Sequence, residues 1–307
     1  MNEHRFDGRV AIITGAGRGI GRGYARLLAD RGASVVVNDL GGSMAGEGSD
    51  AGPAATVVAE ISGAGGAAVA DTSDVATTDG AQALVAAAVE RFGRIDILVN
   101  NAGIMRWAGL PELDLTDLER HLAVHVAGSF NTIRAAWPHM LEQGYGRIVN
   151  TTSCGVFGLP LNLAYATAKG GVIGMTRSLA TVSETHGIKV NLIAPAAMTR
   201  MAGRGGDAPD PPETGPMAPD LVAPMVAFLA HEDCPVNGEI YTAGAGRFAR
   251  LFLASTVGSV HADGEATIED VAQSWVTIND EIGYFVPTDL MDWSATFTSH
   301  LGPGARA

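Results

Sequence analysis

Cysteine is scarce in this 307-residue sequence, which holds only Cys154 and Cys234. Two cysteines cannot build a disulfide framework, and alone they cannot complete a zinc site, so we predict no metal. A chain of this length buries enough apolar surface to hold a core without either device. Free thiols are typical of a reducing compartment, and we expect a cytoplasmic protein.

Positive charge is also in short supply, with 20 lysine and arginine residues against 33 aspartate and glutamate residues and a net charge of −13. Such a chain repels phosphate backbones and anionic lipid surfaces, so we expect no nucleic-acid and no membrane partner. No apolar run approaches the roughly 18 residues of a membrane helix. The first residues, MNEHRFDGRV, do not resemble a secretory signal. The expected partner is a small-molecule substrate.

Apolar runs and helical stretches alternate over nearly 200 residues. Only 17% of the residues are charged and 47% are hydrophobic, which excludes a disordered chain. Strands are expected at 9–14, 34–37, 67–70, 95–99, 147–151, 188–193 and 238–242, with helices at 24–31, 53–61, 79–92, 116–141 and 163–186. This order predicts an α/β protein with a doubly wound parallel sheet in three layers.

The predicted sheet domain covers residues 1–250, and a C-terminal extension follows at 251–307. The sequence from Thr267 to Asp270 resembles a helix capping box. Trp275, Ile278, Ile282 and Phe285 then recur at helical spacing, so we expect a helix packed on the body or on a neighbouring subunit. Within the domain, the Gly-, Pro- and Asp-rich stretch 202–219 is expected to form a mobile flap.

A glycine-rich turn follows the first expected strand, where residues 14–21 read TGAGRGIG. Glycines let the backbone turn tightly and approach a pyrophosphate, and the N-terminus of the next helix offers unpaired N–H groups to it. A plain turn is the alternative, but the strand–turn–helix context favours a dinucleotide site. The expected phosphate-binding residues are Gly15, Gly17, Arg18, Gly19, Ile20 and Gly21.

Asp39 ends the second expected strand, 18 residues beyond Gly21. A carboxylate there can accept the ribose hydroxyl protons of NAD and would repel the 2′-phosphate of NADP. Arg18 argues the other way, since a guanidinium could hold that phosphate. Repulsion between two anions in contact is costly, whereas Arg18 can swing into solvent. We therefore predict NAD in preference to NADP.

Two further strand ends carry candidate cofactor contacts. Asp74 and Val75 could bond the adenine, or Asp74 could cap the helix that follows. Asn101, Ala102 and Gly103 could place backbone against the cofactor, or they could form an ordinary turn.

Tyr165 and Lys169 are four residues apart on an expected helix and therefore share a face. A tyrosine with an ordinary pKa of about 10 is a poor base at neutral pH. A nearby ammonium stabilises the phenolate and lowers that pKa toward the working range. Lys169 could also bond the nicotinamide ribose, so both residues are candidates for cofactor binding as well as for catalysis.

These motifs together resemble the short-chain dehydrogenase/reductase family over about residues 6–247. The resemblance is carried by Thr14 to Gly21, Asn100 to Gly103, Ser153, Tyr165-x-x-x-Lys169 and Asn191-x-x-x-Pro195. It implies a Rossmann fold and a nicotinamide cofactor. It also implies a centre in which Tyr165 is the acid/base, Ser153 orients the substrate oxygen and Lys169 lowers the pKa of Tyr165. It also implies that Pro195 and Thr199 lie at the cofactor.

Two departures from the family pattern affect the catalytic residues. His125 stands where the family has an asparagine that holds a relay water, and it could form a relay with Asn101 or be an ordinary helix histidine. Counting back from Tyr165 places Thr152 at the serine position, whereas counting along the strand places Ser153 there. We prefer Ser153, because the strand fixes where the side chain points.

A narrower resemblance is to the (3R)-hydroxyacyl-CoA dehydrogenases, carried by residues 36–42, 124–125, 135–137 and 244–247. It implies an NAD-dependent oxidoreductase that acts on a 3-hydroxyacyl thioester. We expect the substrate to lie over the nicotinamide, between Met105, Phe157, Leu159 and a flap at 198–220. Hydroxysteroids or other secondary alcohols are alternatives, as are a dehydratase, an epimerase and a non-catalytic redox sensor. The family implies a homodimer or homotetramer that pairs through the long helices.

Overall fold

The computed structural model describes residues 3–202, 214–261 and 264–301. The chain divides into two compact units, Met1–Arg250 and Leu251–Ala307, and each is considered by itself. None of the helices in the described ranges combines the length and hydrophobicity that a membrane crossing requires.

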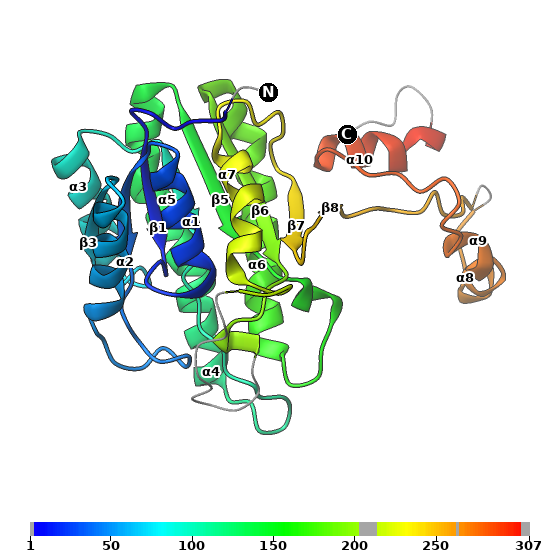
Figure 1. Cartoon of the computed structure of the whole chain (residues 1–307). Coiled ribbons are helices and arrows are strands. Elements are labelled where there is room, and N and C mark those ends of the chain that lie inside the picture. Colours follow the sequence, from blue (N-terminus) through cyan, green and yellow to red (C-terminus); the bar gives the residue numbers. More distant parts are fainter. Residues whose placement is uncertain (1–2, 203–213, 262–263, 302–307) are drawn as a thin grey trace. The chain divides into compact units, whose positions relative to one another are not determined.

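The first unit contains one eight-stranded sheet in the order β3-β2-β1-β4-β5-β6-β7-β8 (Figure 1). Its strands are β1 (Val10–Thr14), β2 (Ser34–Asn38), β3 (Ala67–Asp71), β4 (Ile97–Asn100), β5 (Gly146–Thr151), β6 (Ile188–Pro195), β7 (Ile240–Gly244) and β8 (Arg247–Leu251). Strands β1 to β7 pair in parallel. The strand order reverses between β1 and β4, and such a switch point opens a crevice at the carboxyl ends of the strands.

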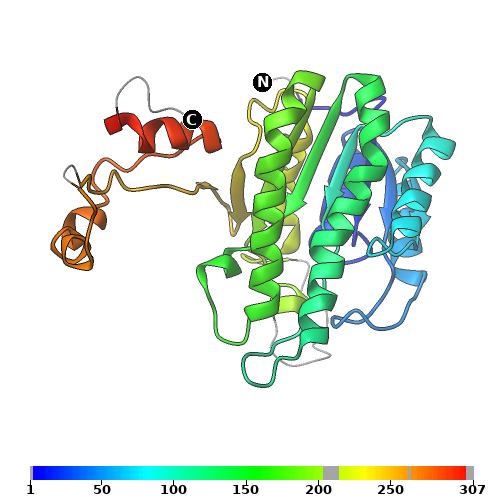
Figure 2. The ribbon, with the colours of Figure 1, turned by 180° about the vertical axis from the view of Figure 1, so that it is seen from behind.

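Helices cover both faces of this sheet, which confirms the predicted doubly wound fold (Figures 1 and 2). They are α1 (Gly19–Asp30), α2 (Gly52–Gly63), α3 (Thr78–Phe92), α4 (Leu115–His121), α5 (Gly128–Gln143), α6 (Leu163–Ser183) and α7 (Ala223–Ala230). Helices α1, α2 and α7 contribute to one apolar cluster, and α3, α5 and α6 contribute to the other. The strands are buried on both faces, as parallel strands in α/β proteins are.

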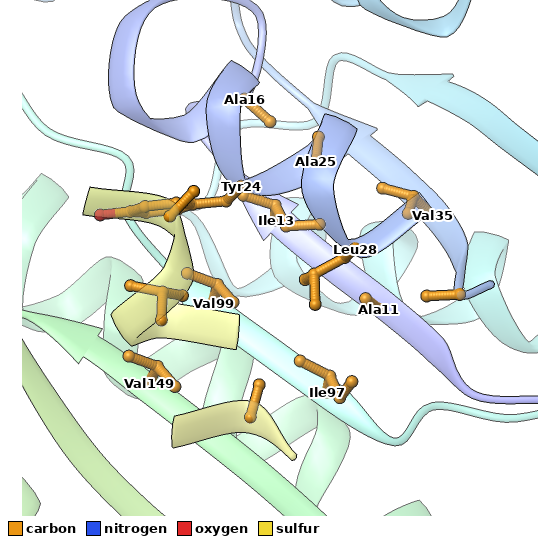
Figure 3. Close-up of a cluster of buried hydrophobic side chains, with 14 of the residues drawn as sticks. Ala11, Ile13, Ala16, Tyr24, Ala25, Leu28, Val35, Ile97, Val99 and Val149 are labelled. Atoms are coloured by element: carbon orange, nitrogen blue, oxygen red, sulfur yellow. The ribbon is translucent and has the colours of Figure 1, made fainter. Parts of the chain in front are cut away.

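Alternate residues of each strand face opposite clusters because side chains alternate along a strand. Ala11 and Ile13 of β1 pack toward Tyr24 and Leu28 of α1 (Figure 3), whereas Ile12 belongs to the cluster on the other face. This packing fixes α1 behind the glycine-rich turn and so sets the position of its N-terminus.

The helix expected at 116–141 is interrupted by the π-helical turn Leu122–Ala127, which joins α4 to α5. The N–H of Gly128 donates to the carbonyl of Ala123, and the Ser129 hydroxyl donates to the carbonyl of His125 at 2.8 Å. The additional residue in this turn accompanies an inward, buried His125. Single π turns of this kind are frequent at functional sites.

The second unit holds the short helices α8 (Ile268–Gln273), α9 (Trp275–Ile278) and α10 (Leu290–Phe297). The capping box of Thr267 and Asp270 is confirmed. The single helix expected through Phe285 is wrong: α9 ends at Ile278, and Phe285 instead pairs with Ser255 in an isolated bridge. None of the described residues beyond Arg250 is buried, so this unit has no core of its own.

Candidate active site

A cleft of about 670 Å³ opens at the carboxyl ends of β1, β2 and β4. The loop residues that follow these strands line it, as the switch point predicts. Among the expected cofactor-binding residues, those on the lining are Gly15, Gly17, Arg18, Gly19, Ile20, Gly21, Asp39, Asp74, Val75, Asn101, Ala102, Gly103 and Thr199.

The glycine turn is a cradle that side chains would fill. Gly15 has a φ of +62°, and a Cβ there would lie 2.8 Å from the Cα of Ala102. A Cβ on Gly17 would lie 2.8 Å from the Asp39 carboxylate, and one on Gly21 would collide with the carbonyl of Gly15. Arg18 precedes α1 without a side-chain cap, so the helix presents its first N–H groups to the cleft. These residues fit a bound pyrophosphate.

Asp39 is fixed at the end of β2 by two backbone amides. Its carboxylate accepts hydrogen bonds from the N–H of Gly17 at 2.8 Å and from the N–H of Gly41 at 2.7 Å. Hydrogen bonds to a carboxylate are strong, and each oxygen retains capacity to accept another. The side chain that the sequence assigns to cofactor selection is therefore held rigidly on the cleft wall.

Thr14 and Asn101 brace the glycine turn against β4. The Thr14 hydroxyl accepts from the N–H groups of Asn101 and Ala102, each at 3.0 Å. The Asn101 amide donates to the carbonyls of Thr14 and Gly15, also at 3.0 Å. The expected part of Asn101 in a proton relay is not supported, because its donor group is committed to these carbonyls. The sequence motif contains Thr14, but its bracing role depends on the β1–β4 pairing.

Asp74 lines the cleft but does not cap the helix that follows it. Its carboxylate accepts from the N–H of Ala76 at 2.9 Å, whereas Thr77 is the N-cap of α3 and accepts from Gly80 at 3.0 Å. The capping alternative for Asp74 is therefore wrong.

The loop after β2 also lines the cleft, which the sequence did not predict. It closes on itself where the N–H of Asp50 donates to Leu40 at 2.9 Å, and it crosses to the segment after β4 where Met105 donates to Met44 at 2.9 Å. The lining residues of this loop are Leu40, Gly42, Ser43, Met44, Gly46 and Asp50. The sequence feature that could have indicated this role is the high glycine content of the loop.

A second group of residues forms a buried cluster where α6 packs against the end of β5. The Lys169 ammonium donates to the carbonyl of Thr151 at 2.7 Å and lies 5.5 Å from the centre of the Tyr165 ring. The Thr152 hydroxyl donates to the carbonyl of Lys169 at 3.0 Å. These hydrogen bonds attach α6 to the end of β5 and so determine where Tyr165 lies relative to that strand end.

Ser153 and Thr152 occupy different environments. Thr152 is fully buried, and its hydroxyl is committed to the α6 backbone. Ser153 is partly exposed, accepts from the N–H of Gly155 at 3.0 Å, and forms a side-chain hydrogen bond with Tyr165. The geometry therefore favours Ser153 as the hydroxyl that shares a substrate oxygen with Tyr165.

Burial dominates the protonation of this cluster. It raises the pKa of Tyr165, and the hydrogen bond to Ser153 lowers that pKa. Burial also lowers the pKa of Lys169 from 10.5 to about 7. That Lys169, when charged, lowers the pKa of Tyr165 stays a prediction. At neutral pH the desolvated lysine carries only part of its charge.

His125 lies against Tyr165, with the ring centres 5.3 Å apart and the rings perpendicular. Its Nε2 is 2.9 Å from the carbonyl oxygen and 3.2 Å from the nitrogen of Ile104. Burial lowers the pKa of His125 well below its usual value, so the ring is neutral near pH 7. Its buried Nδ1 has no hydrogen-bond partner among the described residues. A neutral imidazole with a free nitrogen is chemically able to hold a water.

Residues 9–207 match the family model described as short chain dehydrogenase. The chain belongs to the short-chain dehydrogenase family. It is an oxidoreductase that acts on CH–OH donors with NAD(P). The match covers the glycine turn, the Ser153–Tyr165–Lys169 cluster and the cleft walls except Pro219 and Asp220.

Several relatives of this dehydrogenase are known. It is 43% identical over 280 residues to the peroxisomal multifunctional enzyme type 2 of Drosophila melanogaster. The aligned region covers 90% of this chain and 46% of that protein. The chain thus spans about half the length of that relative. It is 36% identical over 245 residues to the 3-oxoacyl-[acyl-carrier-protein] reductase of Synechocystis, covering 78% of this chain and 96% of that protein.

Among solved structures, 7α-hydroxysteroid dehydrogenase complexed with NADH and 7-oxo glycochenodeoxycholic acid superposes with a TM-score of 0.67. The two are 30% identical, and the match covers 79% of this chain and 95% of that one.

The cleft and the buried cluster of this dehydrogenase meet at Ile104, which lines the cleft and contacts His125. Ser153, Tyr165, Lys169 and Pro195 are not among the lining residues of the cleft. Pro195 ends β6, opposite Ala243 of β7.

The residues expected to wall the substrate differ in their solvent exposure. Met105 is buried, whereas Phe157 is 74% and Leu159 44% exposed. Of the expected flap, Thr199 to Met201, Pro219 and Asp220 line the cleft, and its central stretch 203–213 lies outside the described residues.

Proposed function

We propose that this dehydrogenase uses NAD to interconvert a 3-hydroxyacyl thioester and the corresponding 3-oxoacyl thioester. The observation that supports this substrate class is the similarity to a 3-oxoacyl-[acyl-carrier-protein] reductase. The aligned region covers 96% of the length of that reductase. The resemblance to (3R)-hydroxyacyl-CoA dehydrogenases, in which His125 is typical, supports the same class.

Tyr165 is the acid/base of the proposed reaction. On oxidation, the substrate hydroxyl gives its proton to the Tyr165 oxygen while the carbinol C–H bond breaks. A nicotinamide ring held in the cleft would supply the hydride acceptor. Ser153 bonds the same substrate oxygen and, through its hydrogen bond, opposes the rise in the pKa of Tyr165 that burial causes. On reduction, Tyr165 returns the proton.

Lys169 and His125 support Tyr165 in different ways. Lys169 holds the end of β5 through Thr151, and its ammonium, when charged, favours the phenolate. The neutral His125 packs against the Tyr165 ring and offers Nδ1 to a water that would carry the proton toward solvent. This relay involves His125 and not the Asn101 amide.

The preference for NAD rests on Asp39. Its carboxylate is held by the amides of Gly17 and Gly41, so it cannot withdraw from a 2′-phosphate without breaking both bonds. Burying two anions against each other is unfavourable. Arg18 lines the same cleft and is the group that could offset this repulsion.

The test is NADH formation with a panel of 3-hydroxyacyl-CoA esters of several chain lengths, a hydroxysteroid and simple secondary alcohols, each with NAD and with NADP. The proposal expects the highest kcat/KM with a 3-hydroxyacyl-CoA and NAD. A higher kcat/KM with the hydroxysteroid would make this a hydroxysteroid dehydrogenase. NADH binding without turnover on any alcohol would indicate a redox sensor, and product without net NADH would indicate a dehydratase or epimerase.

We also propose that the dehydrogenase is a homodimer or homotetramer paired through α5 and α6, and that it is cytoplasmic. Light scattering of the purified protein measures the oligomeric state, and a mass equal to that of one chain would overturn the proposed homodimer or homotetramer.

A further inference from the structure

A second hollow, of about 860 Å³, lies at the opposite end of α7 from the cofactor cleft. Its lining comes from residues that precede β1, from Arg94 and from the turn His231 to Asp233 that follows α7. The cofactor cleft is reached instead by Pro219 and Asp220, which precede α7. The two hollows are thus independent sites.

Three potential metal ligands converge in this hollow from two separate parts of the chain. His4 Nε2 lies 3.6 Å from Asp233 Oδ2, and His231 Nδ1 lies 3.4 Å from the same oxygen. All three ligand atoms lie within 4.8 Å of one another. Zinc binds nitrogen and carboxylate oxygen at about 2.0–2.2 Å in tetrahedral geometry, which places two ligands of one ion about 3.3–3.6 Å apart. The observed separations from Asp233 already match this geometry.

The surroundings of His231 resemble those of a ligating histidine. Its Nε2 lies 3.1 Å from the carbonyl oxygen of Arg5, which as acceptor places the ring proton on Nε2 and leaves the lone pair on Nδ1. Metal-binding histidines commonly donate their other nitrogen in this way. That lone pair now accepts from the N–H of Asp233 at 3.1 Å, so the metal would replace this hydrogen bond.

The local charges permit a cation despite the arginines in the hollow. Arg5 is paired with Asp7 at 2.7 Å, and Arg9 bridges Asp96 and Glu232, each at 3.0 Å. Within the part of the chain that the structure describes, Asp233 pairs with His4 and with His231. Its carboxylate is therefore a negative charge in the hollow that faces two imidazoles.

We propose that His4, His231 and Asp233 form a Zn²⁺ site that ties the segment before β1 to the turn after α7. Two imidazoles and one carboxylate are a ligand set suited to zinc, with the fourth position open to water. A count of cysteines could not reveal this site, because its ligands are histidine and aspartate. The site lies apart from the cofactor cleft and takes no part in the dehydrogenase reaction.

The test is a calorimetric titration of the metal-free full chain with ZnCl₂, with MgCl₂ as the control ion. Wild type should bind one Zn²⁺ per chain at this site, and its Tm should rise by several degrees. His4→Ala and Asp233→Asn should each weaken binding at least tenfold and abolish the rise in Tm, since each removes one ligand. His186→Ala, which removes an exposed histidine elsewhere, should bind as wild type does.

Turnover in these variants should stay within twofold of wild type, because the site is remote from the cleft. Both residues are exposed, so the variants should fold, and circular dichroism is the measurement that checks this. Equal zinc binding by His4→Ala and wild type, or no stoichiometric binding by wild type, would overturn the proposal. The histidines and Asp233 would then form only an ordinary ion-pair cluster.

Discussion

The candidate cofactor cleft of this dehydrogenase and the buried cluster around Tyr165 differ in which part of the chain forms them. The cleft is made largely of backbone, with glycines where a Cβ would touch Ala102 or Asp39. The cluster is made of buried side chains that contact one another, and Lys169 is fully desolvated within it. Substitutions in the cleft should therefore weaken binding by steric means, whereas substitutions in the cluster should change proton transfer and stability.

Apart from removal of the Tyr165 hydroxyl, the largest expected effect comes from Lys169→Met. Removing the ammonium takes away the charge that favours the Tyr165 phenolate, and removing the bond to Thr151 loosens the end of β5. We expect kcat to fall by about 10²–10³, while NADH binding, measured by fluorescence titration, weakens less than tenfold. A kcat within threefold of wild type would show that Lys169 has no part in the reaction.

The same variant should be more stable than wild type at pH 6. The pKa of Lys169 is about 7 when folded and 10.5 when unfolded, so between these values the unfolded chain binds more protons. The stability of wild type therefore rises with pH across this window, and the cost of the buried charge is fully present below about pH 7.

Methionine removes that cost but leaves the Thr151 carbonyl without its donor, for a net gain of about 2 kcal/mol. Urea unfolding from pH 6 to 10 measures the difference, which should shrink as the pH rises. A constant difference would contradict the assigned burial of the charge.

Ser153→Ala and Thr152→Val test which hydroxyl serves catalysis. Ser153→Ala should lower kcat about 10²-fold without changing the free energy of unfolding, because Ser153 is partly exposed. Thr152→Val should do the reverse, with a loss of about 1 kcal/mol of stability from its buried hydrogen bond and little change in kcat. Steady-state kinetics and urea unfolding on both variants decide between the two residues. The opposite pattern would show that Thr152 supplies the catalytic hydroxyl.

In the cleft, Gly17→Ala should raise the KM for NAD by roughly ten- to a hundredfold, with kcat at saturating NAD nearly unchanged. The new methyl group would displace Asp39 and Pro53, which lie 2.8 and 2.7 Å from the position of its Cβ. Gly63→Ala is the matched control, since nothing lies within 4 Å of that position. An unchanged KM in Gly17→Ala would place the dinucleotide elsewhere.

The smallest expected effect is on cofactor choice. Asp39→Ala removes the repulsion of a 2′-phosphate and the acceptor for the ribose hydroxyls, so the ratio of kcat/KM for NADP to that for NAD should rise about tenfold. Arg18→Ala in the same background should reverse part of this gain. No change in the ratio would mean that Asp39 does not select the cofactor.

The cleft could be predicted from the sequence more completely than the cluster. A glycine turn between an apolar strand and a helix is a local signal, and Asp39 at the next strand end follows from the parallel order of the strands. The choice between Thr152 and Ser153 depends on which hydroxyl meets α6, and spacing alone gave conflicting answers. The structure separates them because Thr152 bonds the Lys169 carbonyl.

Other features depend on contacts that a local pattern does not contain. The π turn at Leu122–Ala127 accompanies the contact between His125 and Ile104, two segments that are distant in sequence. The apolar stripe after Trp275 suggested one continuous helix, but Asp280 and Gly283 interrupt it, and Gly283 has a φ of +78°. Strand β8 was missed because its side chains are largely exposed and lack the apolar pattern of the others.

The most direct test of the separation between binding and chemistry is Tyr165→Phe, measured on one preparation by NADH titration and by turnover of a 3-hydroxyacyl-CoA. Phenylalanine keeps the ring that packs against His125 and removes the hydroxyl alone. Affinity for NADH within about twofold of wild type, with kcat reduced at least about 10³-fold, is the predicted result. Substantial turnover in the variant would contradict the account, because proton exchange would then belong to another group.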